Sequence, residues 1–190
     1  MLLFFDTETS GLPRNHQAPV SDLANWPRLV QIAWLLTDAQ GGRQQAVEAI
    51  IRPDGFTIPV DAARVHGIAT ERAMAEGQPL HQVLQQFLET LQRADTLVAH
   101  NIAFDEKVLG AELLRCGLPN PLPDYKRHCT MEASTALCQL PGPCGYKWPR
   151  LEELHRHLFG RGVDSAHNAL ADMEATARCF FELQHRGVIA

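Results

Sequence analysis

Short apolar runs separated by turn residues fill the first part of the chain, a pattern that is typical of β-strands. Residues 2–5 are continuously apolar, as expected for a central strand that is buried on both faces. A second β-prone run covers residues 29–36. After the turn signal Gly41-Gly42, residues 45–51 alternate between polar and apolar side chains. We therefore expect one central strand followed by a two-stranded hairpin.

Helical periodicity takes over after Pro59 and is strongest between Leu80 and Leu91, where apolar residues recur with the spacing of one helix face. We expect this helix to pack against the sheet. Two further strands are expected over residues 96–99 and 125–129. The remaining helices are expected over residues 104–116, 131–138, 150–159 and 168–185, with loops over residues 119–123 and 140–143.

Three strands followed by alternating helices and strands indicate an α/β protein with a mixed, mostly five-stranded central sheet flanked by helices. The chain has 190 residues, and we expect them to form a single domain over residues 1–190. A composition of 45% hydrophobic and 21% charged residues is that of a globular protein and argues against disorder.

Two features of the sequence bear on the cellular compartment. The apolar start of the chain is interrupted at once by Asp6 and Glu8, so it is too short for a signal-peptide core or a membrane span. The five cysteines are odd in number and contain no C-x-x-C pair, which fits a reducing compartment. We therefore expect a cytoplasmic protein that does not bind membranes.

The formal net charge of −5 counts against a protein that wraps long stretches of nucleic acid. Residues 126–161 nevertheless carry six basic and three acidic side chains, a local net charge of +3. This stretch also contains Tyr146, Trp148 and Phe159, and the mixture suits contact with a few nucleotides through stacking and phosphate pairing. A solvated helix face beside ordinary packing aromatics explains the same pattern.

Four acidic residues stand where predicted strands end or predicted helices begin. Asp6 and Glu8 are two positions apart at the end of the first strand, so their carboxylates share one face. Asp105 falls in the first turn of the helix after the fourth strand, near the strand end where open α/β sheets bind ligands. Stabilisation of the helix dipole is the alternative role for Asp105. Asp172 lies one turn into the last predicted helix, and His167 converges on it only from the loop before that helix.

The four carboxylates are hard oxygen ligands, which suit Mg²⁺ or Mn²⁺ far better than zinc. Two such ions hold a phosphodiester, activate a water and stabilise the leaving oxygen in an in-line displacement. An imidazole such as that of His167 suits the proton transfer from this water, because histidine has an ordinary pKa of about 6.5. Four carboxylates without cations repel a phosphate substrate, so we expect two divalent ions as cofactors.

The motifs around these residues resemble those of the DnaQ-like 3′-to-5′ exonucleases, and the histidine is typical of the DEDDh branch. The motifs are Asp6-Thr7-Glu8-Thr9-Ser10-Gly11-Leu12, Asn101-x-x-Phe104-Asp105 and His167-x-x-x-x-Asp172, in the family's order. The resemblance covers nearly the whole chain. It implies a ribonuclease-H-like fold, two divalent ions and stepwise release of nucleoside 5′-monophosphates from 3′ ends of single-stranded or frayed DNA, or of RNA.

The resemblance also implies a role for each matching position. Asp6, Glu8, Asp105 and Asp172 are the implied metal ligands, and His167 is the implied general base. The implied substrate-binding residues are Thr7, Thr9, His66, Asn101 and Phe104. His66 stands in Val65-His66-Gly67-Ile68, although a helix that ends at a histidine before a C-cap glycine explains this element equally well. The chain departs from the family in a longer segment over residues 15–26 and in Cys129-Thr130, where many relatives have Asp-Thr.

Other functions are compatible with the same motifs. An RNA-trimming exoribonuclease similar to oligoribonuclease differs only in its substrate, and a polymerase-associated proofreading subunit differs only in its partner. A nucleic-acid-binding module without catalysis is expected to have lost at least one of the five catalytic positions, and all five are present. Nucleic acid is the expected partner, and a DNA polymerase or a second copy of the chain, as a homodimer, is the candidate protein partner.

Overall fold

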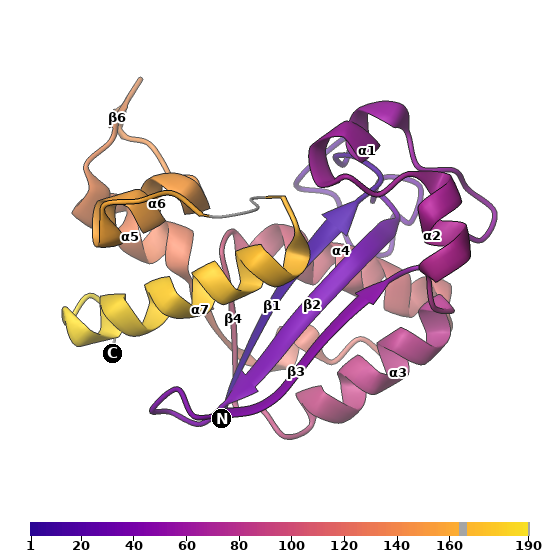
Figure 1. Cartoon of the computed structure of the whole chain (residues 1–190), viewed down its shortest axis with the longest axis horizontal. Coiled ribbons are helices and arrows are strands. Elements are labelled where there is room, and N and C mark those ends of the chain that lie inside the picture. The colour runs from indigo at the N-terminus through magenta and orange to yellow at the C-terminus, as the bar shows by residue number, and fades with distance from the viewer. Residues whose placement is uncertain (164–166, 190) are drawn as a thin grey trace.

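The computed structural model describes residues 1–163 and 167–189, which form a five-stranded sheet with helices on both faces (Figure 1). The strand order is β3-β2-β1-β4-β5. The first three strands are antiparallel neighbours, whereas β1, β4 and β5 run parallel, so the predicted mixed sheet is confirmed. The strands are β1 (Leu2–Thr9), β2 (Leu29–Thr37), β3 (Arg43–Ile50), β4 (Thr96–Ala99) and β5 (Lys126–Cys129).

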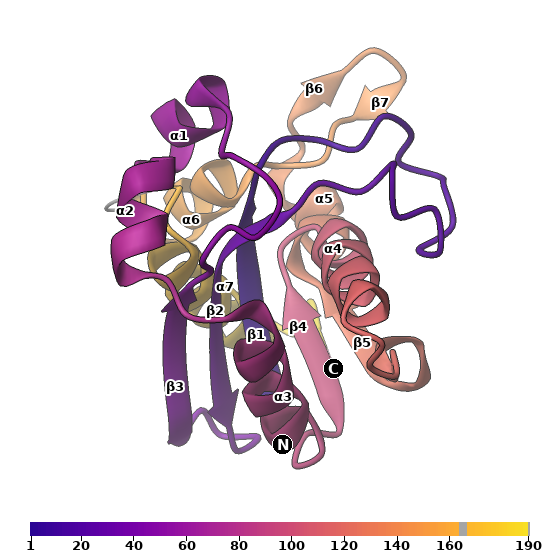
Figure 2. The same ribbon diagram turned by 90° about the vertical axis from the view of Figure 1, so that its right-hand side faces the viewer.

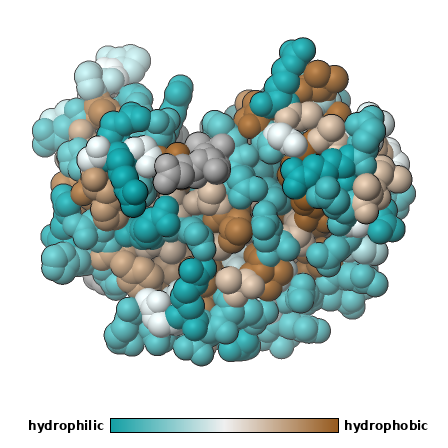
Figure 3. All heavy atoms as spheres, viewed as in Figure 1, coloured by the Kyte–Doolittle hydropathy of each residue, from teal (hydrophilic) through white to brown (hydrophobic). Residues whose placement is uncertain are grey.

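Helix α7 covers one face of the sheet, and α3 and α4 cover the other (Figures 1 and 2). The helices are α1 (Val60–His66), α2 (Thr70–Glu76), α3 (Leu80–Leu91), α4 (Ile102–Arg115), α5 (Thr130–Cys138), α6 (Leu151–Phe159) and α7 (Ala169–His185). A short 3₁₀ helix covers Leu122–Asp124. Among the helices of the described ranges, none is both long enough and apolar enough to cross a bilayer. Hydrophilic residues make up most of the face shown in Figure 3.

Strand β1 is buried on both faces, as its continuous apolar run predicts. Leu3 and Phe5 pack into the core on the side of α3 and α4. Phe4 points the opposite way and packs edge-on against Phe180 of α7, with ring centroids 5.4 Å apart. Because successive side chains of a strand alternate between faces, the next polar residues of β1 are divided between the same two sides.

Strand β1 continues beyond its apolar run to Thr9, so Asp6 and Glu8 lie at the end of the strand as predicted, and its polar residues stay paired with β2 through the backbone. The structure differs from the predicted elements elsewhere. The predicted loop over residues 140–143 contains β6 (Pro141–Gly142), which pairs with β7 (Gly145–Tyr146). Strands of two residues are too short to produce an alternating pattern. The short helices α1 and α2 likewise span too few turns to give a clear apolar stripe.

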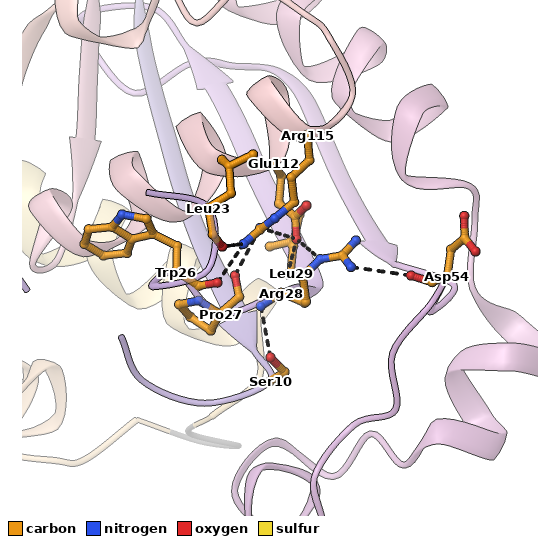
Figure 4. A network of polar contacts seen from close by, with 9 residues as sticks. All are labelled: Ser10, Leu23, Trp26, Pro27, Arg28, Leu29, Asp54, Glu112 and Arg115. Atoms are coloured by element: carbon orange, nitrogen blue, oxygen red, sulfur yellow. Dashed lines mark hydrogen bonds and ion pairs between the residues drawn. The ribbon is translucent and has the colours of Figure 1, made fainter. Parts of the chain in front are cut away.

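A buried carboxylate on α4 anchors the long segment between β1 and β2 (Figure 4). Glu112 is fully buried, and its Oε1 accepts hydrogen bonds from Arg28 Nε at 2.9 Å and from the Leu29 N–H at 2.8 Å. Arg115 lies 3.2 Å from the same oxygen and donates to backbone carbonyls of the segment. The Arg28 N–H donates to Ser10 Oγ at 2.9 Å, so this network also holds the chain directly after β1.

Candidate active site

Three carboxylates meet beside the end of β1. Asp6 and Glu8 lie on the face of β1 that α7 covers, and Asp172 lies in the first turn of α7. One oxygen of each carboxylate lies within 4.8 Å of the other two. The prediction that Asp6 and Glu8 share one face is therefore confirmed, and α7 brings Asp172 to them. Carboxylate oxygens at such separations match the ligands of Mg²⁺ and Mn²⁺.

Asp105 reaches the site from α4 on the opposite face of the sheet. Its side chain is buried, and its Oδ1 accepts the Thr7 N–H at 3.0 Å and the Thr7 hydroxyl at 2.6 Å. Thr7 stands between Asp6 and Glu8 in β1, so the two hydrogen bonds fix Asp105 to the strand that carries both acids. Asp105 is not one of the three carboxylates within 4.8 Å, although its charge raises the pKa of Asp6 and of Glu8.

Burial raises the pKa of all four carboxyl groups, and repulsion from neighbouring acids adds to this for Asp6, Glu8 and Asp105. Burial raises the pKa of Asp6 well above its usual range, and the nearby acids raise it further. The pKa of Glu8 rises to about 7, chiefly through burial and then through the charge of Asp172. Burial also raises the pKa of Asp105 to about 7, against the lowering effect of the Thr7 hydrogen bonds. Near neutral pH such a cluster holds either protons or cations.

His167 precedes α7, which is the placement that its convergence with Asp172 requires. The His167 N–H donates to Asp172 Oδ2 at 3.0 Å, and the histidine side chain is exposed. Burial raises the pKa of Asp172, whereas this hydrogen bond and the imidazole charge lower it. The backbone of His167 thus holds Asp172, while the imidazole stays exposed to solvent.

Two of the predicted site residues have an uncommon backbone conformation. Within the described ranges, the non-glycine residues with positive φ are Asn101 at 66°, Gln139 at 50° and His167 at 67°. A side chain in this left-handed region costs roughly 1–2 kcal/mol, and such residues often cluster at functional sites. Asn101 directly precedes α4, so its turn sets the direction of the helix that carries Asp105. The sequence contains only a weak signal for this turn, namely that asparagine tolerates positive φ.

Two predicted substrate-binding residues, Thr9 and His66, lie at the end of β1. Thr9 Oγ1 donates to the carbonyl of Gly11 at 2.7 Å and closes the turn after the strand. His66 ends α1 before Gly67, which has φ of 73°, so the C-cap geometry weighed for this element is present. The His66 Nδ1 accepts the Ile68 N–H at 3.1 Å, and burial lowers the pKa of the imidazole, an effect that the Thr9 backbone partly offsets.

The other two predicted substrate-binding residues, Asn101 and Phe104, line a cleft of about 370 Å³. Phe104 packs with one side against the core. Both residues lie just before Asp105 at the start of α4, so the cleft adjoins the carboxylate site through this helix.

Sequence reasoning missed Gln31. Its side chain is buried on β2, where it is the register partner of Glu8, and its Oε1 accepts the Ala169 N–H at 3.0 Å. Gln31 thereby holds the first residue of α7. The available signal was one polar residue inside an otherwise apolar strand, Leu29-Val30-Gln31-Ile32-Ala33.

His100, at the end of β4, was also missed. Its Nε2 lies 3.0 Å from the carbonyl oxygen of Pro149, and its Nδ1 lies 3.0 Å from the hydroxyl of Thr130. A carbonyl only accepts, so Nε2 carries the proton and Nδ1 accepts the hydroxyl. Burial lowers the pKa of His100 to about 4, so the ring is neutral. It ties the end of β4 to the segment before α6.

Comparisons with known proteins identify a similar family and a similar fold. The exonuclease family RNase_T matches residues 3–180. The fold is similar to that of E. coli Exonuclease I in complex with a dT13 oligonucleotide, with a TM-score of 0.78 and 21% sequence identity over 97% of this chain and 41% of that chain. A moderately thermophilic Exonuclease I from Methylocaldum szegediense gives a TM-score of 0.75 and 23% identity over 97% of this chain and 40% of that chain.

The zinc-bound form of the E. coli ExoI–ssDNA complex gives a TM-score of 0.77 and 23% identity, again over 97% of this chain and 40% of that chain. This chain therefore spans about two fifths of the length of these structures. A search of curated proteins found no match. The structural similarity establishes a ribonuclease-H-like fold, as predicted.

Proposed function

The chain belongs to the RNase_T exonuclease family, and on this premise we propose that it is a metal-dependent 3′-to-5′ exonuclease. The observation that carries the proposal is the cluster of Asp6, Glu8 and Asp172, whose oxygens lie within 4.8 Å of one another. The proposed reaction releases nucleoside 5′-monophosphates from the 3′ ends of single-stranded or frayed DNA. Complexes of E. coli Exonuclease I with dT13 and dA16 support single-stranded DNA as the substrate class.

The donor set fits two divalent cations, Mg²⁺ or Mn²⁺. Asp6, Glu8 and Asp172 supply hard oxygens at short separations, and Asp105 completes the set from the other side of β1. Their raised pKa values support the same assignment, because the repulsion between these groups is relieved when cations bind. When bound, such ions neutralise the carboxylates and stabilise the charge that develops on the phosphate during in-line displacement.

The proposed general base is His167, whose exposed imidazole lies beside Asp172. A neutral ring nitrogen accepts a proton from the attacking water as its oxygen bonds to phosphorus. The bond to the 3′ oxygen of the preceding nucleotide then breaks, and that oxygen takes up a proton. The hydrogen bond from the His167 N–H to Asp172 holds the backbone of His167 next to this carboxylate.

The proposed binding residues flank these carboxylates on two sides. Thr9 and His66 lie together at the end of β1, while Asn101 and Phe104 lie at the start of α4. A 3′-terminal nucleotide between the two pairs has its phosphodiester at the carboxylates. Thr7 acts in this scheme through its hydrogen bonds to Asp105.

The test is degradation of 5′-labelled single-stranded DNA and RNA of identical sequence with Mg²⁺, Mn²⁺ or EDTA, with the products resolved on a gel. We expect a ladder that shortens from the 3′ end with either metal and is lost in EDTA. The faster substrate decides between DNA and RNA. Folded protein that degrades neither strand with any metal overturns the proposal and favours a nucleic-acid-binding subunit.

A further inference from the structure

Three aromatic side chains, Trp26, Phe104 and Trp148, line one cleft of about 370 Å³ next to the carboxylate site. Figure 2 shows the segment between β1 and β2 on the same side of the molecule as the β6–β7 hairpin, above α4 and α5. A cleft of this size is at the lower end of the range for small-ligand sites, about 300 Å³ and upwards. The remaining lining residues are His16, Asn101, Ala103, Lys107, Met131 and Glu132.

Trp148 is a fixed but exposed platform at the rim of this cleft. Its side chain is 64% exposed, although it is among the largest apolar groups of the chain. Its backbone is held on both sides, because the Lys147 N–H donates to the Leu140 carbonyl at 2.9 Å and the Pro149 carbonyl lies 3.0 Å from His100 Nε2. An indole that is positioned by its neighbours and open to solvent is suited to stack on a flat partner.

The floor of the cleft is preformed. Trp26 is only 3% exposed, and its Nε1 donates to the Pro19 carbonyl at 3.0 Å. Lys107 Nζ lies 5.3 Å from the centroid of the Trp26 ring and donates to the His16 carbonyl at 2.7 Å. These contacts fix the floor without a ligand.

The charges of the cleft favour binding of a nucleobase over binding of a phosphate group. Lys107 already uses its ammonium group on the His16 carbonyl and on the Trp26 ring, and Glu132 contributes an opposite charge. The negative charge of Glu132 therefore offsets the positive charge of Lys107. Flat aromatic surfaces remain as the main source of attraction, and stacking on them is tolerant of base identity.

The cleft and the carboxylates share one turn of helix. Residues Ala103, Phe104 and Lys107 line the cleft, and Asp105 belongs to the carboxylate site. One helical turn rises about 5.4 Å, so a strand that has its 3′ end at the carboxylates reaches the cleft within its next few nucleotides.

We propose that this cleft binds an unstacked base of the substrate strand, one to three nucleotides behind the 3′-terminal residue, with Trp148 as its stacking platform. The inference rests on the proposed exonuclease function and extends the proposed binding surface from Asn101 and Phe104, which also line the cleft, to Trp148. It assigns to Trp148, in the segment between β7 and α6, a role in holding the strand.

Photocrosslinking with Ca²⁺ in place of Mg²⁺ tests this contact, because Ca²⁺ offsets the charge of the carboxylates while its longer bonds to oxygen should not support cleavage. A dT decamer carries 5-iododeoxyuridine at one position, which is moved from the second to the sixth nucleotide from the 3′ end, and the crosslinked peptide is identified by mass spectrometry. We expect a crosslink to Trp148 from one of the second to fourth positions and none from the sixth. Crosslinks that avoid Trp148 from every position overturn the inference.

Substrate length supplies the second measurement. In the wild type we expect KM to fall as the DNA lengthens from a dinucleotide to a pentanucleotide. In Trp148→Ala the KM for the pentanucleotide should be about tenfold higher than in the wild type. Trp148→Phe should reverse part of this increase, because phenylalanine still stacks. The matched control is Tyr146→Ala. It removes an exposed aromatic side chain that lies two residues before Trp148, in β7, and does not line the cleft. An equal KM for Trp148→Ala and the wild type at all lengths overturns the inference.

The two measurements separate this inference from the proposed function. A crosslink to Trp148 from protein that cleaves no strand with any metal supports the cleft and overturns the nuclease. A normal ladder without a crosslink to Trp148, and with unchanged length dependence in Trp148→Ala, supports the nuclease and overturns the cleft.

Discussion

Gln31 Oε1 accepts the backbone N–H of Ala169 at 3.0 Å and so fixes the start of α7 to the strand that pairs with β1. Gln31 is also the register partner of Glu8, and its Nε2 donates to Glu48 Oε1 at 2.7 Å. The buried amide of Gln31 therefore ties the helix that carries Asp172 to the position of β2 that lies opposite Glu8. The relative position of the two carboxylates depends on it.

We expect Gln31→Leu to lower kcat more than tenfold and to cost about 1–3 kcal/mol of stability, because the buried Ala169 N–H loses its acceptor. Single-turnover kinetics and urea denaturation measure the two effects. Gln44→Leu, at an exposed position of β3, is the control and should change neither. Full activity of Gln31→Leu would show that other contacts suffice to place α7.

The hydroxyl of Thr7 should set the affinity of the site for metal. Thr7→Val removes the 2.6 Å hydrogen bond to Asp105 and keeps the backbone one, so the pKa of Asp105 should rise further. We expect about tenfold more Mg²⁺ for half-maximal activity, since a hydrogen bond to a charged group contributes about 1.5–3 kcal/mol. Thr7→Ser should restore the wild-type titration, and a Thr7→Val curve that overlays it contradicts this role.

The two proposed roles of His167, as general base and as backbone support for Asp172, can be tested separately. Its N–H holds Asp172, so a substitution leaves that hydrogen bond in place and removes only the imidazole. We expect His167→Asn to lose at least about 10²-fold in kcat while Mg²⁺ affinity is retained, because general bases contribute about 10²- to 10⁴-fold. Asparagine is preferred to alanine here, since it tolerates the positive φ of 67°. Turnover at the wild-type rate would remove His167 from the mechanism.

Stability without metal should fall as the pH rises through the site's titration range. Glu8 and Asp105 have a folded pKa of about 7, above the ordinary value of about 4. Between these values the folded state holds protons that the unfolded state has released, so raising the pH favours unfolding. We expect a lower Tm in EDTA at about pH 8 than at about pH 6, with Mg²⁺ reversing the loss. A Tm in EDTA that rises over this range contradicts the raised pKa values.

The Glu112 network should contribute strongly to stability. Glu112→Leu leaves the side chains of Arg28 and Arg115 and the Leu29 N–H without their shared acceptor. The cost of breaking a buried pair is about 3–5 kcal/mol. Because both arginines are partly exposed, we expect the lower end of that range, measured by urea denaturation. Glu174→Gln, which breaks the exposed pair with Arg43, should cost under about 1 kcal/mol.

Periodicity and motif spacing were enough to predict most elements. Helix α3 and strand β4 have the predicted bounds, because strong apolar patterns within one element need no distant partner. The shared face of Asp6 and Glu8 followed from the two-residue repeat of a strand. The positions of Asp105 and Asp172 in the sequence were also enough to predict that each lies in the first turn of its helix. Each of these features is determined by residues near one another in the sequence.

What only the tertiary structure decided are contacts between elements far apart in the chain. The hydrogen bonds of Thr7 to Asp105, of Gln31 to Ala169 and of His100 to Pro149 join residues separated by dozens of positions. No local pattern marks such pairs, because a polar side chain gains its partner only when the sheet and helices have packed. The sequence by itself determined which acidic side chains stand at the strand ends and helix starts, and packing decided which side chains hold them together.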